Sequence, residues 1–216
     1  AAYNEGDTSV AIDTIVITDV DTDETITATL TLNDVNAGVL TTSGTATYDD
    51  ATGVWTMTGT AANVNAALAA LTFTPNTNYD QNTFITTHIE DQAGTGPADG
   101  VITLDVTPAN DPPTATNLAS TAAYNEGDTS VAIDTIVITD VDTDETITAT
   151  LTLNDVNAGV LTTSGTATYD DATGVWTMTG TAANVNAALA AMTFTPNTNY
   201  DLDTTITTHI EDQAGT

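Results

Sequence analysis

Two acidic loops hold the residues of this sequence whose types and spacing could do chemistry. The first loop alternates carboxylates with other side chains, at Asp19, Asp21 and Asp23, and Glu24 follows directly. The same four acids recur 121 residues later. Alternating carboxylates turn several oxygens toward a single point, which suits Ca²⁺, a hard cation that takes about six to eight oxygen ligands in flexible geometry. Mg²⁺ fits less well because it keeps water and demands a tighter octahedron.

The loop is not an EF-hand. Glu24 stands where that motif requires Gly, and Leu30 stands where it requires its closing Glu. Taken alone, alternating acids are also typical of a solvated turn that binds no metal. The choice between these interpretations depends on the other acids of the chain and on the source of any positive charge near them.

The composition leaves the carboxylates without any Lys or Arg as a partner. The chain contains 30 Asp and Glu residues, no Lys and no Arg, and its formal net charge is −30 at pH 7. Such a charge produces strong self-repulsion, so any positive charge must come from solvent cations, a bound metal or a partner. We expect no nucleic-acid partner, because nothing in the sequence can neutralise phosphate. The absence of Cys excludes disulfides and thiolate metal sites.

The sequence is a tandem repeat. Residues 1–95 and 122–216 are the same sequence offset by 121, apart from four differences: Leu71/Met192, Gln81/Leu202, Asn82/Asp203 and Phe84/Thr205. This period exceeds a solenoid turn of about 20–50 residues and matches one domain per repeat. We expect domains at 1–111 and 112–216, joined by a stiff, proline-rich linker at 108–113. The second repeat stops before a counterpart of its last strand, so we expect both ends to be cuts in a longer protein.

Apolar residues alternate with polar ones through most of each repeat, which is the pattern of half-buried strands. The segment 26–32 places Ile, Ala and Leu on one face and Thr on the other. Further strands are expected at 15–17 and 102–106. Two more flank 49–53, where they form a hairpin with Gly in its turn.

One stretch of each repeat is expected to be helical. Residues 61–70 are rich in Ala, and Val64, Leu68 and Leu71 recur at the spacing of one helix face, with Thr60 as the N-cap. About seven short strands with one short helix indicate an all-β fold, with a β-sandwich of immunoglobulin type in each repeat.

Further acids lie near the ends of the expected strands. Asn4-Glu5-Gly6-Asp7 lies near the start of the repeat, Glu90-Asp91-Gln92-Ala93-Gly94 follows a late strand, and Asn110-Asp111 lies in the linker. Together with the Asp-x-Asp loop, this order of motifs resembles the cadherin pattern. The stretches TGTAANVNAALAALTFTPNTNY and VTPANDPPTAT are similar more particularly to the cadherin-like tandem repeats of giant bacterial surface adhesins, including those of the RTX type.

The resemblance implies Ca²⁺ ions at domain junctions, which stiffen the string of repeats into a rod. Carried over to both repeats, it implies one set of metal ligands: Glu5, Asp19, Asp21, Asp80, Asp91, Asn110, Asp111, Glu126, Asp140, Asp142 and Asp212. Pro108 departs from the family, which has an acidic residue two before the linker Asn. No Asp-Arg-Glu segment is present to support Asp80. We therefore expect fewer ions than at a cadherin junction.

The remaining residues predict no chemistry. His88 and His209 are the only histidines, and His88 shares a strand face with Phe84, a position that is Thr in the second repeat. We therefore expect an exposed surface histidine. Trp55 and Met57 alternate with polar residues and are expected in the core. No nucleophile with a neighbouring base, phosphate-binding loop or redox motif occurs, so we expect no catalytic residue and no enzymatic activity.

These observations predict a Ca²⁺-stabilised structural extender of an extracellular bacterial adhesin, which holds an adhesive region away from the cell surface. Its partners would be neighbouring repeats of the same polypeptide. Bound metal would replace the missing disulfides as the stabilising element of a small extracellular domain. No run of about 18 apolar residues occurs, so no membrane insertion is expected.

Three alternatives remain. The chain could be a self-assembling filament or matrix subunit, in which an open sandwich edge accepts a strand from a neighbouring chain. It could be a carbohydrate-binding module, which exposed aromatic clusters would favour. The acids could also be a salt-adapted surface without any metal site, in which case stability would depend on monovalent salt and be indifferent to EDTA.

Overall fold

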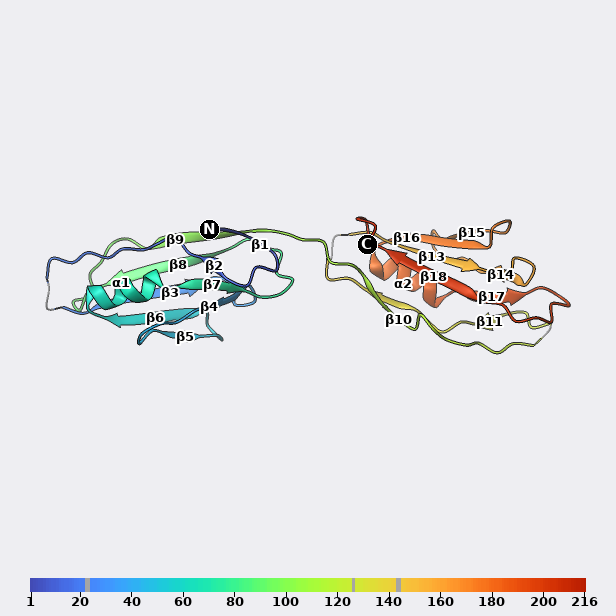
Figure 1. Cartoon of the computed structure of the whole chain (residues 1–216), viewed down its shortest axis with the longest axis horizontal. Coiled ribbons are helices and arrows are strands. Elements are labelled where there is room, and N and C mark those ends of the chain that lie inside the picture. The colour runs from blue at the N-terminus through green and yellow to red at the C-terminus, as the bar shows by residue number, and fades with distance from the viewer. Residues whose placement is uncertain (22–23, 126, 143–144) are drawn as a thin grey trace. The chain divides into compact units, whose positions relative to one another are not determined.

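The chain folds into two compact units. The computed structural model describes residues 1–21, 24–125, 127–142 and 145–216. Unit 1 is Ala1–Ala109 and unit 2 is Asn110–Thr216, so the division falls within the expected linker. Each unit is an all-β, immunoglobulin-like sandwich with one short helix, as predicted (Figure 1). None of the described helices is long and apolar enough to cross a membrane.

Unit 1 contains two sheets and one helix. The larger sheet has the order β1 (Ala2–Asn4), β9 (Gly100–Thr107), β8 (Thr83–Glu90), β3 (Ile26–Leu32), β6 (Val54–Gly59) and β5 (Thr47–Asp49). The smaller sheet has the order β2 (Val10–Ala11), β7 (Thr72–Pro75) and β4 (Gly38–Leu40), and the helix is α1 (Ala61–Ala69). The β1–β9 pair is parallel and the other pairs are antiparallel.

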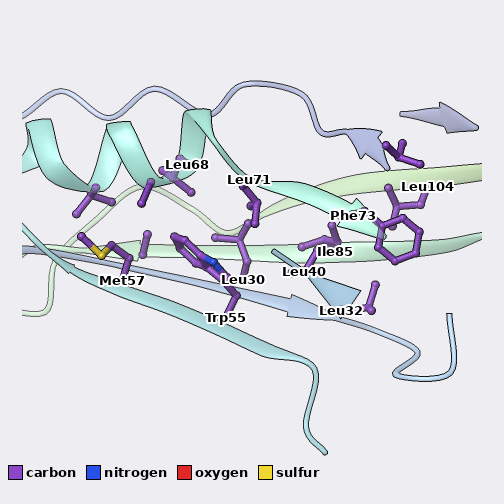
Figure 2. Packing of buried hydrophobic residues seen from close by; sticks show 14 of the residues in the cluster. Leu30, Leu32, Leu40, Trp55, Met57, Leu68, Leu71, Phe73, Ile85 and Leu104 are labelled. Carbon is purple, nitrogen blue, oxygen red and sulfur yellow. The ribbon is translucent and has the colours of Figure 1, made fainter. Parts of the chain in front are cut away.

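The alternation of β3 builds the core of unit 1. Its Ile, Ala and Leu side chains are buried, and its threonines lie on the outer face, where Thr27 and Thr58 share a hydrogen bond of 2.9 Å between their hydroxyls. Trp55 and Met57 are buried, as predicted, and Trp55 is fully inaccessible. Figure 2 shows Leu68, on the helix, pointing toward the larger sheet. The larger sheet therefore forms one side of the core, and the helix together with the smaller sheet forms the other side.

The helix prediction is confirmed. Thr60 is the N-cap, with an extended backbone and a side-chain oxygen that accepts the Asn63 N–H, and α1 ends at Ala69. Val64 and Leu68 are buried on one face, as their spacing predicted. The N-cap and the tertiary burial of this face, rather than length, therefore stabilise a helix of nine residues.

Unit 2 repeats most of this arrangement. Its sheets have the orders β15 (Thr168–Asp170), β16 (Val175–Gly180), β13 (Ile147–Leu153), β18 (Ile206–Glu211), and β11 (Val131–Ala132), β17 (Thr193–Pro196), β14 (Gly159–Leu161). A separate pair joins β10 (Thr114–Thr116) to β12 (Val137–Thr139), and the helix is α2 (Ala182–Ala190).

Identical segments adopt different structures in the two units. Residues 2–4 form β1 because β9 pairs with them, whereas the same tripeptide at 123–125 is irregular. Conversely, 137–139 form β12 against β10, whereas 16–18 are irregular. The strand expected at 15–17 is therefore wrong for unit 1, because a strand requires a hydrogen-bonding partner and not only an apolar pattern.

Gly38 permits the close pairing of β4 with β7. A methyl group at this position would lie 2.1 Å from the Thr74 carbonyl oxygen, which is a backbone atom that has little room to move. We expect Gly38→Ala to destabilise unit 1 by about 1–3 kcal/mol. Urea unfolding followed by Trp55 fluorescence in a Trp176→Phe background reports unit 1 alone, since these are the two tryptophans of the chain.

Gly59→Ala is the matched control. A methyl group there would make an ordinary contact of 3.5 Å with the Asn63 side chain. We expect this variant to be neutral or slightly stabilising, because Ala loses less chain entropy on folding than Gly. Equal unfolding midpoints for the two variants would contradict the steric explanation.

Candidate cation site in the acidic loops

Strand pairing in unit 2 brings three segments to one edge of the sandwich. The acidic loop follows β12 and precedes β13. The end of β18 meets the start of β13, where Glu211 lies opposite Thr148. The start of β10 meets the end of β12, where Thr114 lies opposite Thr139. The loop, the residues after β18 and the linker residues before β10 are therefore neighbours in space although they are far apart in the sequence.

The linker residues contact the acids directly. The Asp111 backbone N–H donates to Asp142 Oδ2 at 2.7 Å, and the Asn110 side-chain amide donates to Asp212 Oδ2 at 2.8 Å. Asp140 Oδ1 accepts the Asp142 backbone N–H at 3.0 Å. Five of the predicted ligands thus lie together with one further acid, and we call this group the acidic cluster: Asn110, Asp111, Asp140, Asp142, Glu145 and Asp212.

Two carboxylate oxygens of the acidic cluster are buried without a hydrogen-bond partner. They are Asp140 Oδ2 and Glu145 Oε2. A buried carboxylate oxygen without a partner carries a large desolvation penalty. Because the chain has no Lys or Arg, no basic side chain can relieve this penalty. These oxygens are therefore suited to a cation supplied from solution.

The surroundings of Glu145 disfavour its ionised form. Burial raises the pKa of the Glu145 carboxyl, and the charges of Asp142, Asp212 and Asp140 raise this pKa further. Several like charges converge on one group, and this is the arrangement in which a bound cation gives the largest electrostatic gain.

Asp212 is held ionised within the cluster. It is 4% exposed. Hydrogen bonds from the Thr216 hydroxyl, the Asn110 amide and the Thr216 backbone N–H hold the pKa of the Asp212 carboxyl far below its usual range. The donors that stabilise this charge come from the linker and from the turn after β18, so Asp212 remains a negatively charged member of the cluster across physiological pH.

Unit 1 has a corresponding group of acids. Burial raises the pKa of the Glu24 carboxyl, and the charges of Asp91, Asp21 and Asp19 raise it further. Hydrogen bonds from the Thr95 hydroxyl and backbone N–H lower the pKa of Asp91. The group in unit 1 therefore repeats the acids of the acidic cluster and the Thr donors to its late-strand Asp.

The remaining predicted ligands lie elsewhere. Glu5 follows β1 at the end of unit 1 where β9 finishes, and its Oε2 accepts the Ala109 backbone N–H at 2.9 Å. Asp80 is exposed in the turn between β7 and β8, and no described hydrogen bond joins it to Glu5. Glu126 lies outside the described residues.

The acidic cluster is not a completed metal site. In the described parts of both units, no three acidic or histidine side chains already surround one point in the manner of bound metal ligands. Asp140, Asp142 and Asp212 each use carboxylate oxygens to accept hydrogen bonds from N–H or O–H groups. Binding of a cation would require side-chain rotation toward the two oxygens that lack partners.

An asparagine clamp positions each acidic loop, and sequence reasoning missed it. In unit 2 the Asn186 side chain on α2 accepts the Ile138 N–H and donates to the Ile138 carbonyl, both at 2.8 Å. Asn65 makes the same two bonds with Ile17 in unit 1. The clamped residue lies two positions before the first acid of each loop. The signal was a pair of Asn residues in an otherwise Ala-rich helix, because Asn is a poor helix former.

Glu145 and Thr216 were also missed as contributors. The acid at the end of each loop was part of the motif but was not assigned as a ligand, because its burial is a tertiary property. Thr216 lies four residues after Asp212 and donates its hydroxyl at 2.5 Å. An Asp-x-x-x-Thr spacing after a strand is the only sequence signal for this contact.

His88 is exposed, as predicted, but it has two acidic partners. Its Nδ1 lies 2.7 Å from Asp99 Oδ1, and its Nε2 lies 3.5 Å from Glu90 Oε2. Hydrogen bonds to Asp99 and Glu90 raise the pKa of His88. His209 lies 3.3 Å from Glu211 in unit 2. Both histidines are therefore surface groups beside acidic side chains, and half or more of each histidine side chain is exposed.

Comparison with known proteins gave only distant likenesses. No family model matches the chain, and no curated protein matches it. Among solved structures, it is similar to the chain named BspA_C_WT, with a TM-score of 0.28, 12% identity, and coverage of 87% of this chain and 84% of that chain. It is also similar to the Streptococcus agalactiae AgI/II polypeptide BspA C terminal domain, with a TM-score of 0.23, 11% identity, and coverage of 88% and 84%. At these TM-scores the likenesses carry no argument about function.

The Asn186 clamp should contribute measurably to the stability of unit 2. We expect Asn186→Ala to lower its free energy of unfolding by about 1–3 kcal/mol, because the Ile138 N–H and carbonyl lose their partners in a partly buried position. Asn184→Ala on the exposed face of the same helix is the control and should be close to neutral. Urea unfolding followed by Trp176 in a Trp55→Phe background measures both. A neutral Asn186→Ala would show that the clamp adds no stability.

Glu145→Gln should stabilise the metal-free chain. A raised pKa in the folded state means that ionised Glu145 opposes folding, so the penalty is absent below the ordinary value of 4.5 and grows as the pH rises through the folded-state pKa. We expect a higher Tm than wild type at pH 7 in EDTA, and a difference that shrinks toward pH 4. Asp171→Asn removes the same charge from an exposed hairpin turn and is the control. A Tm gain no larger than that of the control would contradict the cluster-specific repulsion.

Proposed function

We propose that the chain is a Ca²⁺-stabilised structural repeat of an extracellular bacterial surface adhesin, and that its acidic loops bind Ca²⁺. The single observation that supports this most directly is the pair of buried oxygens without partners, Asp140 Oδ2 and Glu145 Oε2, inside a cluster of acids. Because the chain has no Lys or Arg, a cation from solution is the available source of compensating charge. An extracellular medium supplies Ca²⁺ at concentrations that fit the affinities typical of such modules, about 10⁻⁴–10⁻³ M.

The residues of the acidic cluster fit a hard cation. Asp140, Asp142, Glu145 and Asp212 would provide carboxylate oxygens, and Asp111 from the linker would add another. Bound Ca²⁺ would supply positive charge that neutralises repelling carboxylates, and it tolerates the irregular, oxygen-only donor set that these loops offer. In unit 1 the equivalent acids would be Asp19, Asp21, Glu24 and Asp91. Folding of each unit and occupation of its loops would then be thermodynamically linked.

The linker contacts give the metal a mechanical role. Asp111 donates its backbone N–H to Asp142, and Asn110 donates its side-chain amide to Asp212, so the first residues of unit 2 are tied to the loops that would hold the cation. A cation in the cluster would strengthen these ties by ordering the acceptor carboxylates. Restricting the residues that lead into each repeat limits bending of the array, which is what an extender needs.

The adhesin assignment rests on the sequence. Near-identical repeats, the absence of Cys, a charge of −30 and the resemblance to cadherin-like adhesin repeats favour a surface-exposed array. The tryptophans do not support a carbohydrate-binding platform, since Trp55 and Trp176 are both fully buried.

A Ca²⁺ titration tests the proposal. In 0.5 M NaCl, which screens general repulsion, we expect millimolar Ca²⁺ to raise the Tm of the EDTA-treated chain. At a free concentration of about 10 Kd, which millimolar Ca²⁺ reaches for a Kd of about 10⁻⁴ M, the linkage is worth about 1.4 kcal/mol per site. Asp140→Asn, which keeps the side-chain shape, should remove most of the gain reported by Trp176. Asp171→Asn should retain the gain, and Mg²⁺ should give less stabilisation than Ca²⁺.

Indifference to both EDTA and Ca²⁺ would overturn the proposal. If NaCl alone then raised the Tm, the acids would be a salt-adapted surface. Small-angle scattering with and without Ca²⁺ tests the mechanical part separately. An unchanged scattering profile together with clear Ca²⁺ binding would retain the metal site and reject the stiffening role.

A further inference from the structure

The loop between β8 and β9 in unit 1 is fastened near both of its ends. We call this loop, residues 91–99, the connector. At its start, the Asp91 backbone N–H donates to the Thr95 carbonyl at 2.8 Å, and the Thr95 backbone N–H donates to Asp91 Oδ1 at 2.9 Å. At its end, Asp99 Oδ1 lies 2.7 Å from Nδ1 of His88 on β8. The residues between Thr95 and Asp99 are exposed and form no regular structure.

The His88 ring lies between two carboxylates. Its Nδ1 faces Asp99, and its Nε2 lies 3.5 Å from Glu90 Oε2. Ionised carboxylates only accept hydrogen bonds, and a neutral imidazole has a single N–H to donate. A neutral ring would therefore turn a lone pair toward one of the two acids, whereas the protonated ring presents an N–H to each. Hydrogen bonding to Asp99 and then to Glu90 raises the pKa of His88 accordingly.

Asp99 and Glu90 are the charged groups that face His88 within the described part of unit 1. On β3, the residue opposite His88 is Thr29, which does not titrate. On β9, Val101 follows Asp99 on the same face of the sheet and carries no charge. Unit 1 contains no second histidine and no Lys or Arg, so His88 is its one side chain that can become positively charged.

We infer that His88, Glu90 and Asp99 form a pH-sensitive latch that holds the connector against the larger sheet of unit 1. The protonated ring bridges the connector to β8. Loss of the proton weakens this bridge, because either tautomer of the neutral ring keeps one contact and places a lone pair against the other carboxylate. The bridge is strongest below the ordinary histidine value of 6.5, and it is lost as the pH rises through the higher folded-state pKa of His88.

The latch controls a segment that begins beside the acidic loop of unit 1. Burial and then the charge of Asp91, the first residue of the connector, raise the pKa of Glu24 in that loop. With the latch weakened, the order of the connector depends on the hydrogen bonds between Asp91 and Thr95 at its start. The latch itself contains none of the residues assigned to the cation, so it operates whether or not the acidic loops bind Ca²⁺.

An NMR titration of the isotope-labelled chain in EDTA tests this inference. The ring nitrogens of His88 report its protonation, and the heteronuclear NOE of the Ala98 and Asp99 amides reports the order of the connector on the ps–ns timescale. We expect this order to fall as the pH rises, with the same midpoint as the His88 ring. Asp99→Asn keeps the side-chain shape, and it should move the His88 midpoint toward 6.5 and remove the pH dependence of connector order. Connector order that stays constant while His88 titrates would overturn the inference.

Asp105→Asn is the matched control, because it removes an exposed acid from β9 without touching the latch. Six residues along the strand place Asp105 about 20 Å from Asp99, which exceeds the screening length of about 10 Å in 0.1 M salt. This variant should keep the wild-type His88 midpoint and the pH dependence of connector order. Equal effects of Asp105→Asn and Asp99→Asn would show general charge repulsion and overturn the latch.

Thermal unfolding gives a second test, with Trp55 in the Trp176→Phe background reporting unit 1. The Tm of the chain with His88 should fall relative to that of His88→Gln as the pH rises through the His88 titration, because the stabilising proton is lost. His209→Gln removes the other histidine and should leave this pH dependence of unit 1 unchanged. A Tm difference between His88 and His88→Gln that is the same at every pH would also overturn the latch.

Discussion

The absence of Lys and Arg is the constraint on which the polar structure of this protein depends. Thirty acids must be stabilised without a single Lys or Arg. The chain uses neutral donors instead. Asp34 accepts the Asn36 backbone N–H and the Tyr79 hydroxyl, which lower its pKa, and burial with this bond raises the pKa of Tyr79 to about 12. Asp91 is stabilised in the same manner by Thr95, so tight turns with Asn, Thr and backbone N–H groups replace salt bridges.

Neutral donors do not satisfy every carboxylate oxygen of the acidic cluster. Asp212 receives its donors from Thr216 and Asn110, whereas Asp140 and Glu145 each retain a buried oxygen without a partner. The linker supplies the Asp111 N–H and the Asn110 amide, and these go to Asp142 and Asp212 rather than to the two unpaired oxygens. The cluster therefore differs from the solvated acids of the hairpin turns, which lie in water and need no compensation.

The two units also show how the same sequence folds beside different neighbouring strands. A tripeptide is β1 in unit 1 and irregular in unit 2, and another is β12 in unit 2 and irregular in unit 1. The side chains are identical in each pair of tripeptides. The tripeptide therefore forms a strand only where β9 or β10 is present to pair with it. The Asn65 clamp shows that a side-chain amide can hold an unpaired segment near its strand-like position by supplying one donor and one acceptor.

The sequence by itself determined the features that depend on local pattern. Alternation determined β3, alanine content with a Thr cap determined α1, and repetition determined two units of one all-β fold. The order of its acidic motifs also resembled the cadherin pattern, and this resemblance implied Asn110, Asp111 and Asp212 as ligands, three residues that lie together in the acidic cluster. Only the tertiary structure decided that one carboxylate oxygen of Glu145 is buried among like charges and that Asp80 stands apart. The physical reason is that burial and hydrogen-bond partners come from segments distant in the chain, whereas periodicity is contained within a few consecutive residues.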